Sequence, residues 1–388
     1  MTLHDKNKDR QAQIFRGKRG LEALEGSWRT LQENLADLRF IHYYGWYKSR
    51  LENTETDPES VVFVLASEAD KPIAIFPLQQ VIIRRYGLIL RTWEIYWPND
   101  MGICDFVFAK TSTHSHMLEW LIALLNERKE LSWDLLRLQD TLVDSCALYS
   151  LSSARRLLSL SILHHSSKYI RCDADYEIVM DRLSGHFRRN IRRQTKKIGE
   201  LGDVKYRFVS EASEMEEAFK HFLHAEATSW KGGSGTGSAI QLYEDKVGFY
   251  RRLMQEFALY NACSINLIIV NGSCIASQFC LEVGDTLYLL KIGYSDEHRA
   301  IGPGNVLLNE LIQRCCASTK IKNISFITGA DWNDNWAPES LDVHESYVFN
   351  HTIFGIGAYI LAKAKNYGRH IKHSLQRQWA RRRKALDT

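Results

Sequence analysis

The stretch Tyr288–Cys316, YLLKIGYSDEHRAIGPGNVLLNELIQRCC, decides the fold of this chain. It begins with an apolar run typical of a β-strand, passes through a short polar loop, and reaches Arg299-Ala-Ile-Gly-Pro-Gly304. From Pro303 onward the apolar residues recur every three or four positions, which predicts a helix. Proline suits the first position of a helix because its missing N–H would have no intrahelical partner there.

A strand, an arginine, two glycines and a helix N-terminus in this order predict an anion site. Glycine lets the backbone approach a ligand closely, and free N–H groups at the positive end of the helix dipole point toward it. Taken alone, Gly302 and Gly304 also fit an ordinary loop. The strand before the motif, the helix after it and the hairpin upstream favour a site for a phosphate or pyrophosphate.

The composition is that of a soluble globular protein with room for two domains. The chain has 388 residues, of which 45% are hydrophobic and 25% are charged. No stretch approaches the roughly 20 consecutive apolar residues of a membrane span, and the charged N-terminus lacks the apolar core of a signal peptide. The eight cysteines include no C-x-x-C pair, so neither a zinc site nor a redox pair is indicated. We therefore expect a reduced, cytoplasmic protein without a metal.

The net charge of +4 is unevenly distributed. From Lys363 to the end of the chain there are nine Lys or Arg residues and one acid, Asp387. Such a basic tail predicts peripheral contact with an anionic inner membrane surface or with a biosynthetic complex. A disordered basic end explains the same composition equally well.

The order of predicted elements repeats along the chain. Residues 21–140 read as helix, three strands, helix and strand, and a second block from residue 176 follows a similar order, with its clearest hairpin at Asn271-Gly272. This repetition predicts an α/β (α+β) fold of two copies, each a mixed, largely antiparallel sheet flanked by helices. We divide the chain into a basic arm (1–20), an N-terminal domain (21–175), a C-terminal domain (176–362) and a basic helix or tail (363–388).

The segment Arg182–Lys197 holds seven basic residues and no acid, with its apolar residues on one helical face. Three interpretations fit such a face: a solvated surface, an attraction site for a phosphorylated or nucleotide-linked acceptor, or an RNA site.

The second block resembles a GNAT-type N-acyltransferase domain, in which R-x-x-G-x-G joins a central strand to a helix and holds the pyrophosphate of acyl-CoA. Within that superfamily it is most similar to the CelD-type acetyltransferases linked to cellulose and exopolysaccharide biosynthesis, which are distant relatives of Fem-type aminoacyltransferases. The resemblance covers roughly residues 180–340, and residues 21–175 resemble the degenerate N-terminal half of such proteins more loosely. Gly302 stands where this family often has serine. The resembling pieces are FRRNIRRQTKKIGELG, EATSWKGGSGTGSAI, NGSCIASQF, KIGYSDEHRAIGPGNVLL and TGADWNDNW.

The resemblance implies that acetyl-CoA or another acyl-CoA is the co-substrate. Backbone N–H groups near Ile292 or Gly293 would stabilise the oxyanion that develops during acyl transfer. Arg299 would clamp a phosphate through its forked donors. The residues assigned to the acyl-CoA site are Ile292, Gly293, Arg299, Ala300, Gly302, Gly304 and Asn305.

The acceptor side offers three candidates for the general base: Asp331, Glu226 and His298. For each of them a solvated surface charge is an equally good interpretation. The residues assigned to the acceptor are Trp230, Lys231, Lys291 and Tyr294, although core packing is a competing role for Trp230.

The resulting hypothesis is an acyl-CoA-dependent acyltransferase that acts on an amine or hydroxyl of a sugar or polysaccharide precursor by direct attack on the thioester. Because the resembling family keeps a basic helix at the domain entrance, we expect the segment Arg182–Lys197 to be structural and to attract substrate, and we expect no nucleic acid partner. One alternative is a Fem-like transferase that uses aminoacyl-tRNA, although the coiled-coil arm typical of those relatives is not found. Another is an inactive scaffold in polysaccharide biosynthesis.

Overall fold

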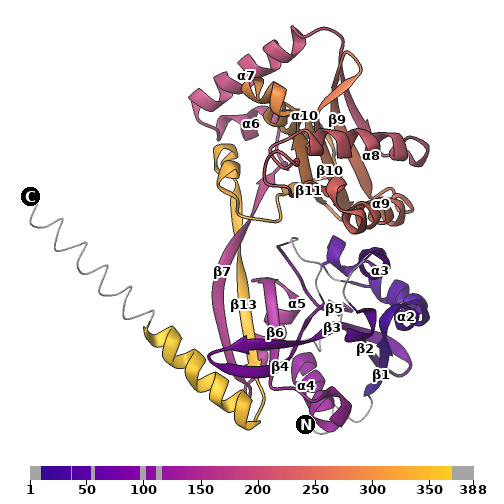
Figure 1. Cartoon of the computed structure of the whole chain (residues 1–388), viewed down its shortest axis with the longest axis vertical. Helices are drawn as coiled ribbons and strands as arrows, with labels where there is room; N and C mark the ends of the chain where they lie inside the picture. The colour runs from indigo at the N-terminus through magenta and orange to yellow at the C-terminus, as the bar shows by residue number, and fades with distance from the viewer. Residues whose placement is uncertain (1–9, 36, 54–56, 97–101, 111–115, 369–388) are drawn as a thin grey trace, which may run out of the picture.

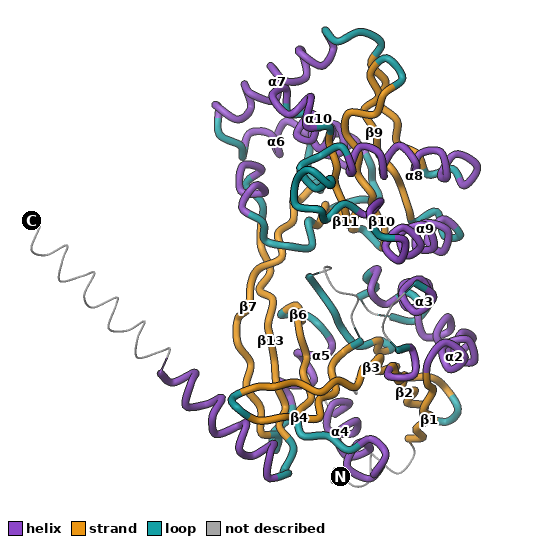
Figure 2. The backbone as a smooth tube through the Cα atoms, in the orientation of Figure 1, coloured by secondary structure: helices purple, strands orange, loops and turns teal. Residues whose placement is uncertain are grey.

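The computed structural model describes residues 10–35, 37–53, 57–96, 102–110 and 116–368. Thirteen strands of this part of the chain form one sheet, in the order β1-β2-β3-β4-β6-β13-β7-β12-β11-β10-β9-β8, with β5 paired to β3. Figure 1 shows that the two long strands β7 and β13 run between the two halves of the molecule. Helices flank the sheet in both halves, and Figure 2 traces the strands as they pass from one half to the other.

The N-terminal half contains, in chain order, β1 (Arg10–Arg16), α2 (Gly17–Gln32), α3 (Tyr44–Glu52), β2 (Val61–Glu68), β3 (Lys71–Arg85), β4 (Leu88–Ile95), β5 (Val107–Phe108), α4 (Met117–Glu127), β6 (Leu135–Leu142), α5 (Cys146–Ser153) and β7 (Leu158–Arg171). The C-terminal half contains α6 (Tyr176–Asp181), α7 (Gly185–Gly199), β8 (Val204–Val209), α8 (Ala212–Ala227), α9 (Glu244–Ala258), β9 (Cys263–Val270), β10 (Ser273–Val283), β11 (Thr286–Tyr294), α10 (Pro303–Ala317), β12 (Asn323–Ser325) and β13 (Glu339–Phe349). A last helix spans residues 353–368.

The two halves repeat one arrangement, which confirms the predicted fold class. Counted from β1 and from β8, and apart from the short strand β5, each half runs as strand, two helices, three strands, helix, strand, a connecting segment and a final long strand. Helices α6 and α7 precede β8 in the C-terminal half. In both halves the strand before the single helix pairs in parallel with the strand after it: β4 with β6, and β11 with β12. The other paired strands in the sheet are antiparallel, as expected for hairpin connections.

The final strand of each half completes the sheet of the other half. Strand β7 pairs with β12, and β13 pairs with β6, while β7 and β13 also pair with each other along their length. The predicted boundary at residue 176 therefore follows the last strand of the N-terminal half in sequence, although that strand lies beside the C-terminal half in space. The halves share one continuous sheet.

The chain termini differ from the sequence-based division. Residues 10–20, predicted to belong to a basic arm, form β1 and the start of α2. Ala12 and Ile14 alternate toward the core on β1, and Arg10 pairs with Glu68 on β2, which explains the strand. At the other end, residues 363–368 continue the last helix, and the remainder of the predicted tail lies outside the described residues. No helix of the described chain has the length and apolar character needed to cross a bilayer.

Aromatic residues before and within α3 join the two halves. Phe40 lies 4.9 Å from Tyr288 of β11, and Trp46 lies 5.5 Å from Phe249 of α9, between ring centroids. A side chain at Gly45 would place its Cβ 2.6 Å from Glu256 of α9, so the two helices approach closely there. This packing fixes how β11, which carries the candidate site, sits against the N-terminal half.

Candidate active site

Strands β11 and β12 run together only briefly and then separate. Thr286–Tyr288 pair in parallel with Asn323–Ser325, but β11 continues to Tyr294. After Ser325 the chain follows β7, because the Phe326 N–H donates to the Lys168 carbonyl. The edge of β11 beyond Tyr288 is therefore without a neighbouring strand on that side.

A cavity of about 380 Å³ lies along this part of β11. Residues of several elements form its wall, including α7, β10, α10 and the segments after α8 and β12. The lining residues are Gln194, Trp230, Ser277, Gln278, Leu289, Ile292, Gly293, Tyr294, Arg299, Gly302, Pro303, Gly304, Asn305, Leu308 and Trp332.

The loop that leads into α10 forms one end of the cavity. A short 3-10 helix, Asp296–Ile301, ends at Gly302, whose φ of +61° lies in the left-handed region. A Cβ at Gly302 would also lie 2.1 Å from Nε2 of Gln194, so both the backbone conformation and the surroundings require glycine. Helix α10 then begins with Pro303, and its first turn points N–H groups toward the cavity end.

Arg299 lies in the same loop and lines the cavity. Its side chain is exposed, and among the described residues no carboxylate lies within ion-pair distance of its guanidinium. Together with the N-terminus of α10, it gives this end of the cavity a positive potential that suits a phosphate or pyrophosphate. Ala300 is exposed and is not one of the lining residues.

Glu226 and Lys231 form a buried link between α8 and β11. The Glu226 carboxylate accepts the Ile240 N–H at 2.8 Å and pairs with Lys231 Nζ at 3.1 Å. Lys231 Nζ also donates to the Ile292 carbonyl at 2.7 Å. Because both carboxylate oxygens of Glu226 are engaged, this geometry describes a positioning pair that holds β11 in place. A role for Glu226 as general base stays a prediction.

The other sequence-assigned residues fall around the cavity. Trp230 and Tyr294 line it, whereas Lys291 does not. His298 is half-buried in the 3-10 helix with its Nδ1 3.4 Å from Ser295 Oγ. Asp331 is exposed at the start of a second 3-10 helix, Asp331–Trp336, directly before the cavity residue Trp332. His298 and Asp331 therefore lie next to the site in sequence, and their catalytic roles remain predictions.

Gln194 and Trp332 are site residues that sequence reasoning missed. Gln194 is buried on α7, and its Oε1 has no hydrogen-bond partner in the described structure. A signal was present, because Gln194 occupies the same helical face as Phe187, Ile191 and Ile198, where an apolar residue is expected. A buried amide that faces both the glycine loop and the cavity is suited to a polar ligand.

The cysteines on neighbouring elements are not poised for covalent catalysis. Burial raises the pKa of the Cys280 thiol on β10 well above its ordinary value. Burial likewise raises the pKa of Cys315 on α10 to about 12. Both thiols are protonated at neutral pH, and the thiolate is the reactive form. Neither thiol is therefore in its reactive form at neutral pH.

Comparison with known proteins agrees with this geometry. The family described as acetyltransferase (GNAT) domain matches residues 185–336, a range that includes every residue lining the cavity. No curated protein matches the chain.

Solved structures show the same fold at low sequence identity. The chain is similar to FemX with a TM-score of 0.57 and 8% identity, covering 89% of this chain and 100% of that one. It is similar to L-PGS from Bacillus licheniformis with a TM-score of 0.53 and 12% identity, covering 90% and 98%. It is also similar to the C-terminal domain of a putative lysylphosphatidylglycerol synthetase from Agrobacterium fabrum, with a TM-score of 0.52 and 8% identity over 88% and 95%. Within this two-half fold, residues 185–336 are the part of the chain that matches the GNAT acetyltransferase domain family.

Proposed function

We propose that this chain transfers an acyl group from acetyl-CoA, or a closely related acyl-CoA, to an amine or hydroxyl. The observation that carries the proposal is the cavity along the splayed strand β11, with the glycine loop and the start of α10 at one end. Such an end binds a pyrophosphate through backbone N–H groups. The open edge of β11 then offers main-chain groups along the direction in which an extended thioester arm would run.

Several residues of this chain have separate roles in the proposed acyl-CoA site. Gly302 and Gly304 keep side chains away from the pyrophosphate position, Arg299 adds a guanidinium, and the buried Gln194 amide faces the loop. Acyl-CoA supplies a thioester, whose carbonyl carbon is open to nucleophilic attack. Lys231 holds the β11 edge through the Ile292 carbonyl, so that the transferred group meets a fixed backbone.

The reaction needs an acceptor nucleophile and a base. The acceptor nitrogen or oxygen forms the new bond to the acyl carbon while the carbon–sulfur bond breaks. The acceptor proton passes to a base, for which His298 and Asp331 are the candidates beside the cavity, and the departing thiolate takes up a proton. N–H groups of β11 near Ile292 and Gly293 would stabilise the developing oxyanion.

We propose a sugar or polysaccharide precursor as the acceptor. The resemblance to CelD-type acetyltransferases supports this class. Two tryptophans that line the cavity, Trp230 and Trp332, are 43% and 42% exposed and present aromatic faces at its surface. Such faces suit the apolar side of a sugar ring, since an aromatic ring combines a large contact area with rigidity.

An aminoacyl-tRNA-dependent reaction is the second candidate. The observation that favours it is the basic face of α7, where Arg189, Arg192, Arg193, Lys196 and Lys197 are all exposed. A face of this kind attracts a polyanion with a strong dependence on salt. An RNA ester would then take the place of the thioester: the acceptor forms the new bond to the acyl carbon, the carbon–oxygen bond to the ribose breaks, and the ribose hydroxyl leaves.

Calorimetric titration of the full chain with acetyl-CoA distinguishes the acyl-CoA-dependent reaction from the aminoacyl-tRNA-dependent one. We expect binding that weakens by at least about tenfold in Arg299→Ala and Gly304→Glu, because each change removes or opposes charge-assisted contacts to the pyrophosphate. Arg128→Ala, an exposed arginine of the N-terminal half, is the matched control and should bind normally. Absence of binding, or equal binding in all variants, contradicts the acyl-CoA proposal. Salt-sensitive binding of aminoacyl-tRNA in its place supports the second candidate.

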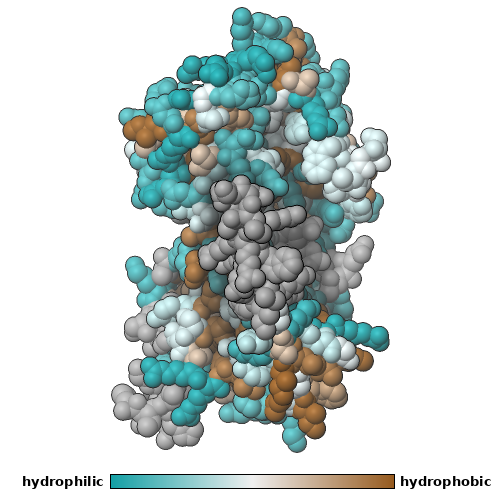
Figure 3. Space-filling view, turned by 90° about the vertical axis from the view of Figure 1, so that its left-hand side faces the viewer, coloured by the Kyte–Doolittle hydropathy of each residue, from teal (hydrophilic) through white to brown (hydrophobic). Residues whose placement is uncertain are grey.

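We also propose that the end of the N-terminal half docks on an anionic membrane. The last helix packs Ala358 and Ala362 against the sheet and turns apolar side chains outward, with Ile353 88% and Ile360 60% exposed. Ile82 on the neighbouring hairpin is 73% exposed. Figure 3 shows apolar side chains gathered at this lower end of the molecule.

Basic residues lie beside these apolar side chains. A cavity of about 460 Å³ is lined by Arg84, Arg85, Arg137 and Lys365, together with Ile83 and Tyr86. Apolar side chains next to clustered arginine and lysine are the combination that binds an interface with anionic lipid headgroups. The rest of the predicted basic tail follows residue 368 in sequence and lies outside the described residues.

A further inference from the structure

Two irregularities of the central sheet meet where β6, β13 and β7 lie side by side. In the β6–β13 pair, Gln139 and Asp140 together stand opposite Glu345, because Thr141 pairs with His344 and Leu138 with Ser346. In the β7–β13 pair, His164 is the extra residue between the positions that pair with Val343 and His344. Each strand therefore bulges at this level. Bulges re-aim side chains and are frequent next to functional sites.

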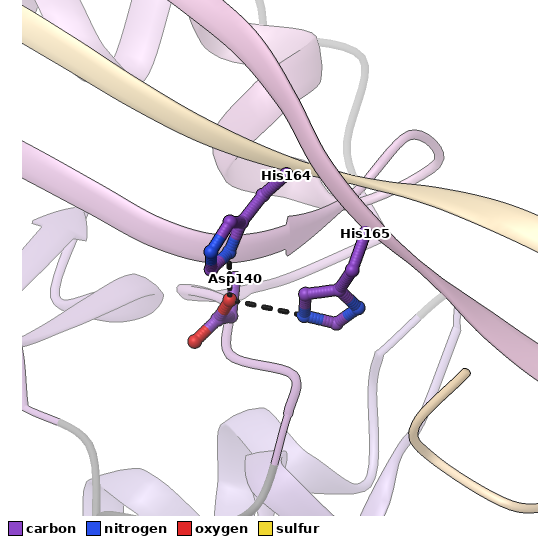
Figure 4. A group of neighbouring side chains, drawn as sticks. All are labelled: Asp140, His164 and His165. Atoms are coloured by element: carbon purple, nitrogen blue, oxygen red, sulfur yellow. Dashed lines mark hydrogen bonds and ion pairs between the residues drawn. The ribbon is translucent and has the colours of Figure 1, made fainter. Parts of the chain in front are cut away.

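The bulges bring three side chains together that a regular sheet would separate. Consecutive residues of a strand point to opposite faces, yet His164 and His165 both reach Asp140. His164 Nδ1 lies 2.9 Å and His165 Nε2 lies 3.1 Å from the same Asp140 oxygen, Oδ1 (Figure 4). Asp140 itself has a φ of +45°, a backbone conformation uncommon outside glycine. The three candidate ligand atoms lie within 4.8 Å of one another.

The contacts of His165 are compatible with a cation beside Asp140. Its Nδ1 lies 3.2 Å from the Ser166 carbonyl oxygen, which can only accept a hydrogen bond, so Nδ1 carries a proton. In the neutral ring, Nε2 then presents a lone pair to the Asp140 carboxylate, which also only accepts. A positive centre between Nε2 and Asp140 resolves this conflict, and it is either a second proton or a metal ion. A ligand histidine whose other nitrogen donates to a backbone carbonyl is the usual arrangement at metal sites.

We propose that Asp140, His164 and His165 bind a divalent transition-metal ion of the zinc class. Two imidazole nitrogens and one carboxylate oxygen are ligands that Zn²⁺ accepts, with a fourth position left for water or another ligand. The exposed fractions of the side chains fit an open site: 10% for Asp140, 30% for His165 and 53% for His164. Glu345, opposite the β6 bulge, pairs with Arg137 through Oε1, and its buried Oε2 has no partner in the described structure.

The position of the site indicates what the ion does. Strand β13 separates β6 from β7 in the sheet, so the ion would connect two strands that are not paired through their backbones. These strands form the junction between the two halves, and Ser167, two residues after His165, lines a separate cavity of about 330 Å³. The ion would clamp this junction and stabilise the relative position of the halves. This inference is independent of the acyl-transfer proposal.

Titration of the chelator-treated full chain tests the proposal. We expect one Zn²⁺ ion per chain by calorimetry, and a visible absorption spectrum of bound Co²⁺ that reports nitrogen and oxygen ligands. Asp140→Asn and His165→Ala should each weaken Zn²⁺ binding by about 100-fold or more, since even residues behind a ligand cost 10–100-fold. Asn is chosen because it tolerates a positive φ and keeps the shape of the side chain.

The matched control replaces His221 and His224 on α8 by alanine, since these two histidines lie on a different element from Asp140, His164 and His165. The control should bind Zn²⁺ as the unmodified chain does. Circular dichroism confirms that each variant is folded, and Zn²⁺ should raise the melting temperature of the unmodified chain but not of Asp140→Asn. Absence of Zn²⁺ and Co²⁺ binding, or equal binding in Asp140→Asn, His165→Ala and the control, overturns the proposal and leaves a hydrogen-bonded cluster.

Discussion

Gly302 is a residue at which two separate effects oppose any side chain. Its φ is +61°, and a Cβ would lie 2.1 Å from Gln194 Nε2. Gly237 has a similar φ of +65°, but a Cβ there would meet nothing within 4 Å. The two glycines therefore separate the cost of the backbone conformation from the cost of the contact.

We expect Gly302→Ala to lower the free energy of unfolding by about 2–3 kcal/mol and Gly237→Ala by about 1 kcal/mol, because the left-handed conformation alone costs about 1–2 kcal/mol. Urea denaturation measures both. Adding Gln194→Ala to Gly302→Ala should recover the part of the lost unfolding free energy that is due to the contact with Gln194. Equal losses of unfolding free energy in Gly302→Ala and Gly237→Ala would show that the Gln194 side chain moves aside without an energetic cost.

The residues of the glycine loop could be predicted because they are contiguous. Arg299, Gly302 and Gly304 belong to one strand–loop–helix sequence, and local spacing brings them to one end of the cavity. Gln194 and Trp332 reach the cavity only through the packing of α7 and the path of the chain after β12. Their positions depend on contacts between distant segments, which spacing along the sequence does not reveal.

At the scale of elements, Asp134 connects β4 to the start of the last helix. Arg91 of β4 donates to the Asp134 carboxylate through its side chain at 2.9 Å and through its backbone N–H at 3.0 Å. Thr352, which caps the helix by accepting the Gly355 N–H, donates to Asp134 Oδ1 at 2.7 Å. Burial alone would raise the pKa of Asp134, but the hydrogen bonds from Arg91 and Thr352 lower it below its ordinary value.

This lowered pKa sets the direction of a pH dependence. The ionised carboxylate stabilises the fold above the pKa of an unfolded aspartate, about 3.9. That contribution is lost as the pH falls through the lower pKa of the folded state. Asp134→Asn should therefore cost about 1–3 kcal/mol near neutral pH, as expected for lost hydrogen bonds to a buried charge.

Urea denaturation at neutral pH and in acid measures the effect, and the difference between Asp134→Asn and the unmodified chain should shrink in acid. Glu130→Gln, which changes an exposed acid, is the control. A difference in unfolding free energy that stays constant with pH would mean that the charge of Asp134 does not stabilise the connection between β4 and the last helix.

The elements that sequence patterns missed include the two long strands that join the halves, β7 and β13. On β7, Leu158, Leu160 and Ile162 alternate regularly, but the bulge at His164 shifts the alternation by one residue. A strand whose alternation of apolar and polar residues breaks in the middle gives no continuous strand pattern in the sequence. Hairpins such as β9–β10 were predictable because the Asn271-Gly272 turn joins neighbours in sequence. The pairing of β13 with β6 joins segments from opposite ends of the chain, and no local turn marks it.

At the scale of the whole molecule, the repeated halves share one arrangement of strands but differ in sequence motifs and surface. Both contain a parallel pair of strands, β4 with β6 and β11 with β12. Only the C-terminal half carries the Arg299–Gly304 loop, and only residues 185–336 match the acetyltransferase family. The N-terminal half instead presents an apolar and basic surface at its far end. These differences are the basis for proposing a small anionic ligand at the C-terminal half and a membrane contact at the N-terminal half.

Sedimentation with lipid vesicles tests the proposed membrane contact. We expect the full chain to bind vesicles that contain phosphatidylglycerol, and to bind phosphatidylcholine vesicles weakly, because the basic residues at Arg84, Arg85 and Lys365 require anionic headgroups. Ile353→Ser combined with Ile360→Ser should reduce binding several-fold, since each change removes apolar area from the interface.

Leu259→Ser is the matched control, because Leu259 is 72% exposed but lies on the C-terminal half, away from this surface. Lys365→Glu should weaken binding and reduce its sensitivity to salt, which separates the electrostatic part of the contact from the apolar part. Equal binding to both vesicle types, or losses as large with Leu259→Ser as with the helix variants, would rule out docking through this end. Binding confined to anionic vesicles and sensitive to the helix alone would place the acetyltransferase domain at a fixed height above the membrane, because the shared strands β7 and β13 hold the two halves in one sheet.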